Sequence, residues 1–161
     1  MRRETLVALL APAPGERVLE IGPGTGYYSL EIAPRLVPGG PLDLLDIQQP
    51  MLDEVRQRAA SVGIANIQTT QSDAQALPFP DATFDAAFLV ATLGEIPDKR
   101  LALREVRRVL KPGGRLVVGE GQPDPHIVSG AGPRDFADEA GVRFERHEGN
   151  RFGFLARFRV A

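Results

Sequence analysis

Apolar residues follow two distinct patterns along this chain, one typical of buried strands and one typical of helices. Short, nearly continuous apolar runs predict buried strands, at residues 18–21, 42–47, 67–72, 84–90 and 115–120. Between these runs, apolar residues at helical spacing predict helices over residues 5–11, 30–37, 50–62, 99–110 and 133–140. Two final strands, 142–147 and 152–160, are predicted to form a hairpin through residues 148–150. This alternation predicts an α/β fold with a mostly parallel sheet and helices on both faces.

The chain is expected to fold as a single domain, residues 1–161. Its 161 residues suffice for one core, and 43% of them are hydrophobic and 25% charged, as in an ordinary globular protein. Residues 1–15 are predicted to form a short N-terminal helix and a linker, and residues 121–132 are the longest predicted loop. In an α/β sheet of this kind we expect the ligand to lie outside the carboxyl ends of the strands, near the point where the strand order reverses.

Composition excludes several kinds of function. The formal net charge of −2 gives no electrostatic case for binding nucleic acid or an anionic membrane surface. The chain has no Cys, which excludes disulfides, thiolate metal sites and a Cys nucleophile, and no metal is expected. No apolar run approaches the roughly 20 residues of a membrane span, so we expect no integral membrane segment. These observations predict a cytoplasmic protein.

Residues 18–26, with the sequence VLEIGPGTG, predict a strand, a tight glycine turn and the start of a helix. Such a turn lets a ligand approach the main chain closely. The spacing is G-x-G-x-G instead of the G-x-G-x-x-G of dinucleotide-binding folds, and Tyr27 occupies the place of the third glycine. Glu20 would repel a phosphate at this turn but attract an ammonium group. A ligand with an amino-acid portion satisfies both Glu20 and the helix start.

Two further acids lie at the ends of predicted strands. Asp46 ends the second strand, where a carboxylate can accept hydrogen bonds from both hydroxyls of a ribose. Asp73 follows the third strand and is placed to accept from an exocyclic amine such as that of adenine. An amino acid, a ribose and an adenine together describe S-adenosylmethionine.

Four segments of the chain resemble class I S-adenosylmethionine-dependent methyltransferases of the small-molecule and quinone type. They are EIGPGTG at 20–26, Asp46 with Met51, SDAQALPF at 72–79 followed by Phe84-Asp85, and LKPGGRL at 110–116. The resemblance implies a Rossmann-like, doubly wound sheet of seven strands, mostly parallel with an antiparallel last strand, in a three-layer αβα arrangement. The hairpin predicted at the C-terminus agrees with that topology.

The resemblance also implies roles for individual residues, with S-adenosyl-L-homocysteine as the product. It implies that Gly22, Gly24 and Gly26 pass under the methionyl portion with Glu20 near its amine, that Asp46 holds the ribose, that Ile47 and Met51 sandwich the adenine, and that Asp73 and Ala74 read its edge. Simpler interpretations stay open. In these interpretations Glu20 is only a buried structural acid, Met51 is a core residue, and both aspartates are solvated acids at strand ends.

The residues on the acceptor side are less well defined, and no catalytic residue is assigned. A general base is optional in methyl transfer, because alignment of the reacting atoms supplies most of the catalysis. Candidates for contact with the acceptor are Tyr27, Tyr28, Glu95, Glu120 and His126. Related enzymes often carry a His-rich turn after the fourth strand, but this chain has LGEI at 93–96, and the Asn-Pro-Pro-Tyr signature of amino methylation is absent.

The sequence therefore predicts a methyltransferase that acts on a small-molecule or lipid-like acceptor. Relatives usually place several helices before the first strand, whereas here that cap is short. The loop at 121–132 would act as a partial lid, or a second copy of the chain or a partner chain would complete the site. Two alternatives remain: a cofactor-binding module without its own acceptor site, and an NAD-dependent oxidoreductase, which Glu20 and the glycine spacing oppose.

Overall fold

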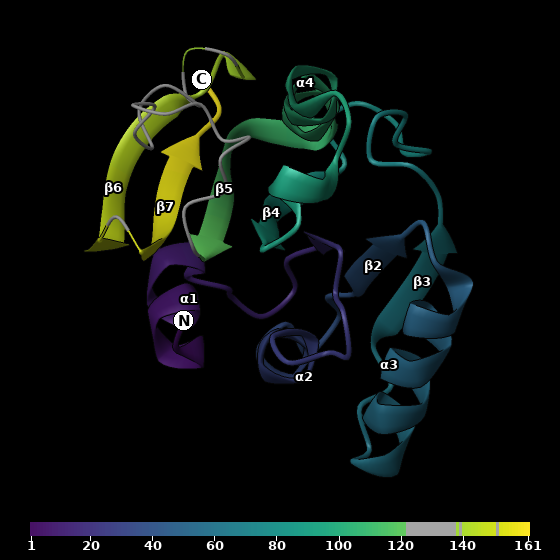
Figure 1. Ribbon diagram of the computed structural model, residues 1–161. Helices are drawn as coiled ribbons and strands as arrows, with labels where there is room; N and C mark the ends of the chain where they lie inside the picture. The colour runs from purple at the N-terminus through teal and green to yellow at the C-terminus, as the bar shows by residue number, and fades with distance from the viewer. Residues whose placement is uncertain (122–137, 139, 151) are drawn as a thin grey trace.

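The computed structural model describes residues 1–121, 138, 140–150 and 152–161, and its centre is a seven-stranded sheet (Figure 1). The strands lie in the order β3-β2-β1-β4-β5-β7-β6. Their bounds are β1 Val18–Ile21, β2 Leu42–Asp46, β3 Ile67–Gln71, β4 Phe84–Val90, β5 Leu110–Gly121, β6 Arg143–Asn150 and β7 Gly153–Arg159. Neighbours from β3 to β5 pair in parallel, and β7 is antiparallel to both β5 and β6. The predicted sheet with an antiparallel last strand is confirmed.

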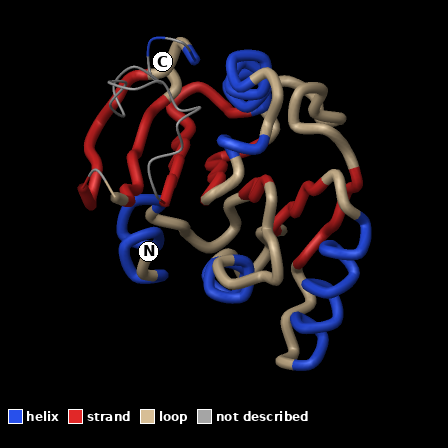
Figure 2. Tube along the Cα trace, in the orientation of Figure 1, coloured by secondary structure: helices blue, strands red, loops and turns tan. Residues whose placement is uncertain are grey.

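Helices cover both faces of this sheet (Figure 2). Helices α1 Arg3–Leu10, α2 Ser29–Ile32 and α3 Gln49–Ser61 pack on one face, and α4 Lys99–Val109 packs on the other. Side chains alternate along β1, so Val18 is buried with the first group and Leu19 with α4. The arrangement is the predicted three-layer αβα. Among the described residues, no helix is both long and apolar enough to cross a membrane.

Three predicted boundaries differ from the structure. The helix expected over 30–37 is instead the short α2 followed by a 3₁₀ helix, η1 Ala33–Arg35, because Pro34 has no N–H to continue an α-helix. The turn expected at 111–114 is part of β5, which pairs with β4 again after a register shift. Strand β6 continues to Asn150, beyond the predicted end at His147. The loop predicted at 121–132, beyond Gly121, and most of the helix predicted at 133–140 lie outside the described residues.

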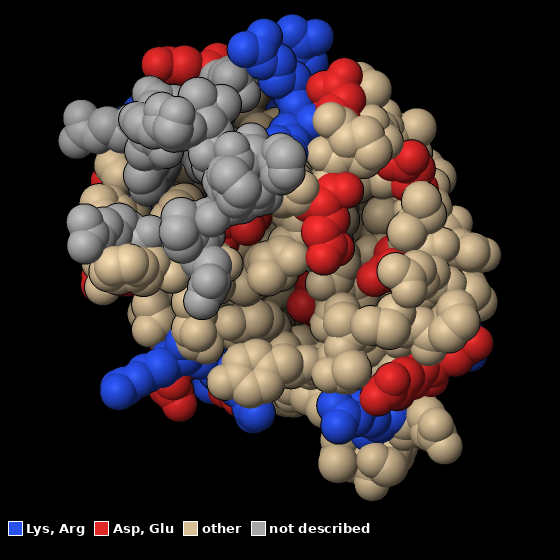
Figure 3. All heavy atoms as spheres, in the orientation of Figure 1, with Lys and Arg blue, Asp and Glu red and all other residues tan. Residues whose placement is uncertain are grey.

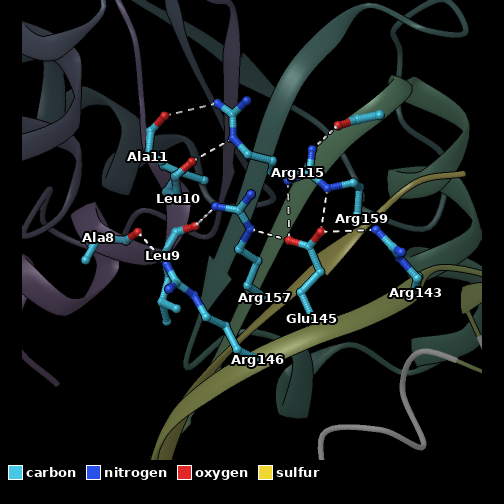
Figure 4. A network of polar contacts seen from close by, with 11 residues as sticks. Ala8, Leu9, Leu10, Ala11, Arg115, Arg143, Glu145, Arg146, Arg157 and Arg159 are labelled. Atoms are coloured by element: carbon cyan, nitrogen blue, oxygen red, sulfur yellow. Dashed lines mark hydrogen bonds and ion pairs between the residues drawn. The ribbon is translucent and has the colours of Figure 1, made fainter.

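Helix α1 is fixed to the sheet through the carbonyl groups at its C-terminal end (Figure 4). Helix ends leave such carbonyls without partners inside the helix. Here guanidinium groups from three strands donate to them: Arg146 to Ala8 O at 3.1 Å, Arg157 to Leu9 O at 2.8 Å, and Arg115 to Leu10 O at 2.7 Å and Ala11 O at 3.4 Å. Positive charge at this end also complements the helix dipole.

A carboxylate on β6 pairs with one of these arginines, Arg157, and with two further arginines beside it. Glu145 pairs with Arg157 at 2.6 Å, with Arg159 at 2.5 Å and with Arg143 at 3.4 Å. We refer to Arg115, Arg143, Arg146, Arg157 and Arg159 together with Glu145 as the arginine cluster. It joins α1 to the three C-terminal strands of the sheet.

Candidate functional site

A cavity of about 600 Å³ opens at the carboxyl ends of β1, β2, β3 and β4. The order of the strands reverses between β1 and β4, which is where open α/β sheets bind ligands. On the face seen in Figure 3, acidic side chains gather near the middle and basic side chains near the edge. The cavity is formed by the ends of strands and the glycine turn, which are the segments that the sequence predicted for ligand binding.

Most of the predicted cofactor residues line this one cavity. The lining includes Gly22, Gly24, Asp46, Ile47, Met51, Asp73 and Ala74. Glu20 and Gly26 are not part of the lining. The structure thus brings seven of the nine predicted residues together at one surface and leaves two behind it.

The three glycines of the turn have different surroundings. All three have positive φ angles. A Cβ on Gly24 would have no heavy atom within 4 Å, so the main chain there borders open space. A Cβ on Gly22 would lie 2.3 Å from Thr92 Oγ1, and one on Gly26 would lie 3.1 Å from Val55 of α3. Packing therefore explains Gly26, whereas the space beside Gly24 leaves room for the predicted approach of a ligand.

Glu20 is buried behind the glycine turn, with 3% of its surface exposed. It accepts a hydrogen bond of 2.5 Å from Ser29 Oγ at the start of α2. Burial raises the pKa of Glu20 to about 8, although the Ser29 hydrogen bond opposes this shift. The buried Glu20 carboxyl thus favours its neutral form at pH 7. Its predicted contact with a ligand amine remains a prediction.

Asp46 lies at the end of β2, and its carboxylate has hydrogen-bond acceptor positions that no described residue uses. Its Oδ1 accepts from the main-chain N–H of Gln48 at 2.8 Å, and no other described residue donates to it. Ile47 is 63% exposed, and α3 brings Met51 to the same cavity, where it is half-buried. An acceptor beside two apolar side chains is typical of small-molecule sites, and the contact of these residues with a nucleoside stays a prediction.

Asp73 is exposed at the cavity after the end of β3, while the neighbouring Ala74 is buried. The main-chain N–H of Gln75 donates to Asp73 at 2.8 Å, and the Gln75 side chain donates to the same carboxylate. These hydrogen bonds, the main-chain one foremost, lower the pKa of Asp73. Asp73 is therefore an ionised acceptor at neutral pH.

Three of the acceptor-side candidates also line the cavity: Tyr27, Tyr28 and Glu95. The two tyrosine rings meet edge to face at 4.8 Å, and the Arg3 guanidinium lies 4.2 Å from the centre of the Tyr27 ring. Tyr28 donates to the carbonyl of Met1 at 3.2 Å. The N-terminal end of α1 therefore lies against the tyrosine side of the cavity.

The other two acceptor-side candidates do not line it. Glu120 is buried in β5, with 7% of its surface exposed, and is not part of the lining. His126 lies outside the described residues. Over the described part of the chain, no group of three or more His, Cys, Asp or Glu side chains is placed to hold a metal ion.

Thr92 and Gln75 are among the lining residues that the sequence did not assign to the site. Thr92 fills the space beside Gly22, and its Oγ1 donates to Val90 O at 3.1 Å. Gln75 contacts Asp73 as described above. Gln75 lies inside the SDAQALPF segment, so its position was visible in the sequence, but its contacts depend on how that loop folds.

The fold and site define a Rossmann-like domain with a ligand cavity at the switch point of its sheet. The sequence profile of the ubiE/COQ5 methyltransferase family matches residues 1–129, and the chain belongs to this family. This confirms the methyltransferase resemblance seen in the sequence and opposes the NAD-dependent alternative.

Among curated proteins, the chain is similar to the ubiquinone/menaquinone biosynthesis C-methyltransferase UbiE of Cellvibrio japonicus. The two are 47% identical over 119 residues, which are 73% of this chain and 48% of that protein. The chain thus spans about half the length of the curated relatives it matches.

Two solved structures share the fold. A SAM-dependent methyltransferase from Aquifex aeolicus matches 99% of this chain and 89% of its own, with a TM-score of 0.88 and 23% identity. The N-methyltransferase NodS from Bradyrhizobium japonicum, in complex with S-adenosyl-L-homocysteine, matches 98% of this chain and 84% of its own, with a TM-score of 0.79 and 22% identity. At these identities the likeness shows the fold alone.

Proposed function

We propose that this chain binds S-adenosylmethionine and transfers its methyl group to a small-molecule acceptor of the quinone type. The observation that carries the proposal is the single cavity at the ends of β1 to β4. It joins the open main chain at Gly24, the carboxylates of Asp46 and Asp73, and the apolar side chain of Met51. Family membership supports this choice of ligand.

The residues present fit such a ligand in size and chemistry. Small-molecule sites typically occupy about 300–1,000 Å³, and this cavity is about 600 Å³. The open main chain at Gly24 would accommodate the methionyl portion, and Asp46 has acceptor capacity for the ribose hydroxyls. Ile47 and Met51 offer apolar surface on either side of a base, and Asp73 offers an acceptor at its edge.

In this proposal the bound cofactor supplies the activated methyl group on its sulfonium, and the protein supplies binding and alignment. Holding two reactants in line contributes a large part of the barrier reduction in such reactions. The residues of the glycine turn and Asp46 would fix one reactant. Tyr27 and Tyr28 would exclude water and offer aromatic surface to a planar acceptor.

The acceptor class comes from the relatives. The similar curated proteins are named as C-methyltransferases of ubiquinone and menaquinone biosynthesis. Their acceptor would be a planar, partly apolar ring, which suits an aromatic surface beside the cavity. For this chain, both the quinone-like acceptor and the carbon that receives the methyl group are part of the proposal.

The test has two stages. We expect S-adenosyl-L-homocysteine to raise the melting temperature of the protein by several degrees, because a ligand that binds only the folded state stabilises it. No shift at millimolar ligand would contradict the proposal. Labelled S-adenosylmethionine is then incubated with hydroxylated aromatic and quinol acceptors, and transfer of label to a ring carbon is expected.

The alternative of a cofactor-binding module is tested by the same experiment. The matched relatives are about one and a half times as long as this chain, so binding and turnover must be measured separately. A thermal shift without transfer to any acceptor favours the module. Turnover that appears only at high protein concentration, or on addition of a partner chain, indicates that a second subunit completes the acceptor site.

A further inference from the structure

Gln75 fixes the carboxylate of Asp73 by three hydrogen bonds. Its main-chain N–H donates to Asp73 Oδ1 at 2.8 Å, and its side-chain Nε2 lies 3.0 Å from Oδ1 and 3.1 Å from Oδ2. The Gln75 Oε1 accepts from the main-chain N–H of Asp98 at 3.1 Å. Asp98 in turn caps α4 by accepting from the main-chain N–H of Leu101. Gln75 therefore bridges the loop after β3 and the start of α4.

The partners of the Gln75 amide determine its orientation. An ionised carboxylate only accepts hydrogen bonds, and a main-chain N–H only donates them. Nε2 must therefore face Asp73 and Oε1 must face Asp98. A flipped amide would lose both contacts, so Gln75 holds the Asp73 side chain in one position.

These hydrogen bonds use most of the acceptor capacity of Asp73. A carboxylate oxygen accepts about two hydrogen bonds. Oδ1 receives both the main-chain and the side-chain donors of Gln75, whereas Oδ2 receives only the side chain, and no other described residue donates to the Asp73 carboxylate. Asp73 and Gln75 both line the cavity. One acceptor position, on Oδ2, is left for a ligand.

We propose that Gln75 is a positioning residue that sets the base specificity of the cavity. By holding Asp73 with one remaining acceptor on Oδ2, it makes the site select a base with an exocyclic amine over one with a carbonyl at that position. A carbonyl there would face a carboxylate, and both acceptors would be left without a donor. The inference rests on the proposed function, because it takes the ligand to carry an adenosyl group.

The experiment compares two ligands on the unmodified protein and on a Gln75→Ala variant by isothermal titration calorimetry. The ligands are S-adenosyl-L-homocysteine and S-inosyl-L-homocysteine, which carries a carbonyl in place of the amine. We expect the unmodified protein to prefer the adenosyl ligand at least tenfold. The variant should lower this preference at least threefold, chiefly by weakening the adenosyl ligand, because Asp73 is no longer held in one position.

Gln71→Ala is the matched control. Gln71 lies at the end of β3 and donates to Ile47 O at 3.1 Å, so it supports the same part of the cavity without touching Asp73. This variant should weaken both ligands in equal proportion or neither. If Gln75 only supported the fold of the loop, Gln75→Ala would likewise change the affinity for both ligands in equal proportion. If Gln75→Ala does not fold, Gln75→Glu provides the comparison, since it keeps the size of the side chain and loses its donors at neutral pH.

A second measurement needs no ligand. NMR titration of the Asp73 carboxyl should show a higher pKa in Gln75→Ala than in the unmodified protein, because the side-chain donors are lost. An unchanged base preference in the folded variant, or an unchanged Asp73 pKa, overturns the role of Gln75. Failure of the unmodified protein to bind either ligand overturns the proposed function itself.

Discussion

The ends of β1 to β4 and the arginine cluster both concentrate polar groups, but the two regions use them in opposite ways. At the cavity, the Asp46 carboxylate accepts one hydrogen bond from the described residues, and the main chain at Gly24 borders open space. In the arginine cluster, Arg157 contacts both Glu145 and the carbonyl of Leu9. Hydrogen-bond acceptors at the cavity therefore remain available to a ligand, whereas the charged groups of the arginine cluster bind other groups of the protein.

The difference follows from what each region must do. A group that faces water loses little when it lacks a protein partner, and it stays able to bind a ligand. A half-buried guanidinium or helix carbonyl without a partner costs free energy, so the arginine cluster pairs them. We therefore expect substitutions in the arginine cluster to change the free energy of unfolding, and substitutions at the cavity to change ligand affinity.

Glu145→Ala should have the largest effect. It removes the carboxylate that pairs with Arg157 and Arg159 and leaves the guanidinium of Arg157, whose side chain is 12% exposed, without its ion pair. Both partners are partly exposed, so we expect a loss of about 2.5 kcal/mol in the free energy of unfolding, between the values for exposed and for buried ion pairs. Urea denaturation measures this change, and affinity for S-adenosyl-L-homocysteine should stay within twofold.

The pH dependence gives an independent check. The hydrogen bond from Arg159, followed by that from Arg157, lowers the pKa of Glu145. A lowered carboxyl pKa contributes stability above the unfolded pKa, and this contribution is lost as pH falls through the folded pKa. The difference between the two proteins should therefore shrink in acid. Glu148→Ala, an exposed acid on the same strand, is the control and should change stability by less than about 0.5 kcal/mol. A similar loss in both variants would contradict the role of the cluster.

Glu20→Gln tests how the buried carboxyl of Glu20, behind the glycine turn, affects the stability of the protein. The pKa of Glu20 is raised from 4.5 to about 8, so the folded protein binds its proton more tightly than the unfolded chain does. Its cost to stability is absent below the unfolded pKa, grows as pH rises, and is complete above the folded pKa. At pH 9 the Gln variant should therefore be more stable than the unmodified protein by about 2 kcal/mol, a value set below the full shift to allow for relaxation.

The measurement is thermal or urea unfolding of both proteins from pH 5 to pH 9. The advantage of the variant should shrink toward pH 5, as the pH approaches the unfolded pKa below which the Glu20 carboxyl is neutral in both states. Ser29 Oγ can donate to the Gln side chain as it does to Glu20, so the hydrogen bond is kept. Parallel stability curves over this range would show that Glu20 is ionised in the folded protein.

The sequence predicted the architecture and most of the cavity because both depend on local pattern. The spacing of apolar residues predicted the strands and helices that form the three layers. Asp46 and Asp73 follow parallel strands, whose carboxyl ends meet at one edge of the sheet, and both line the cavity there. The predicted helix over 30–37 ran through Pro34, a residue visible in the sequence, and the structure ends the α-helix before it.

Contacts between distant segments were not predictable in the same way. Arg157 and Leu9 are separated by 148 positions, and nothing in the local pattern marks Arg157 as the partner of a helix end. Glu20 shows the same limit at short range. Its place beside the glycine turn was clear, but whether it lines the cavity or packs against Ser29 depends on where α2 begins.

Asp46→Asn should have the smallest effect on stability and the clearest effect on binding. The Asn Oδ1 can still accept from Gln48 N–H, so the local turn is kept, but an amide donor replaces the second oxygen. We expect affinity for S-adenosyl-L-homocysteine to fall about tenfold, equivalent to about 1.4 kcal/mol, because the ribose hydroxyls lose an ionised acceptor. Stability without ligand should change by less than about 0.5 kcal/mol.

Calorimetric titration of Asp46→Asn beside Asp53→Asn completes this comparison. Asp53 lies on α3 and is exposed to solvent, where it accepts from the Gln49 side chain and does not line the cavity. Its variant should bind S-adenosyl-L-homocysteine as the unmodified protein does. Equal affinity in all three proteins would mean that Asp46 is only a solvated acid at a strand end. A tenfold loss confined to Asp46→Asn, with an unchanged free energy of unfolding, would show that the unused acceptor at the cavity is kept for a ligand, in contrast to the carboxylate of Glu145.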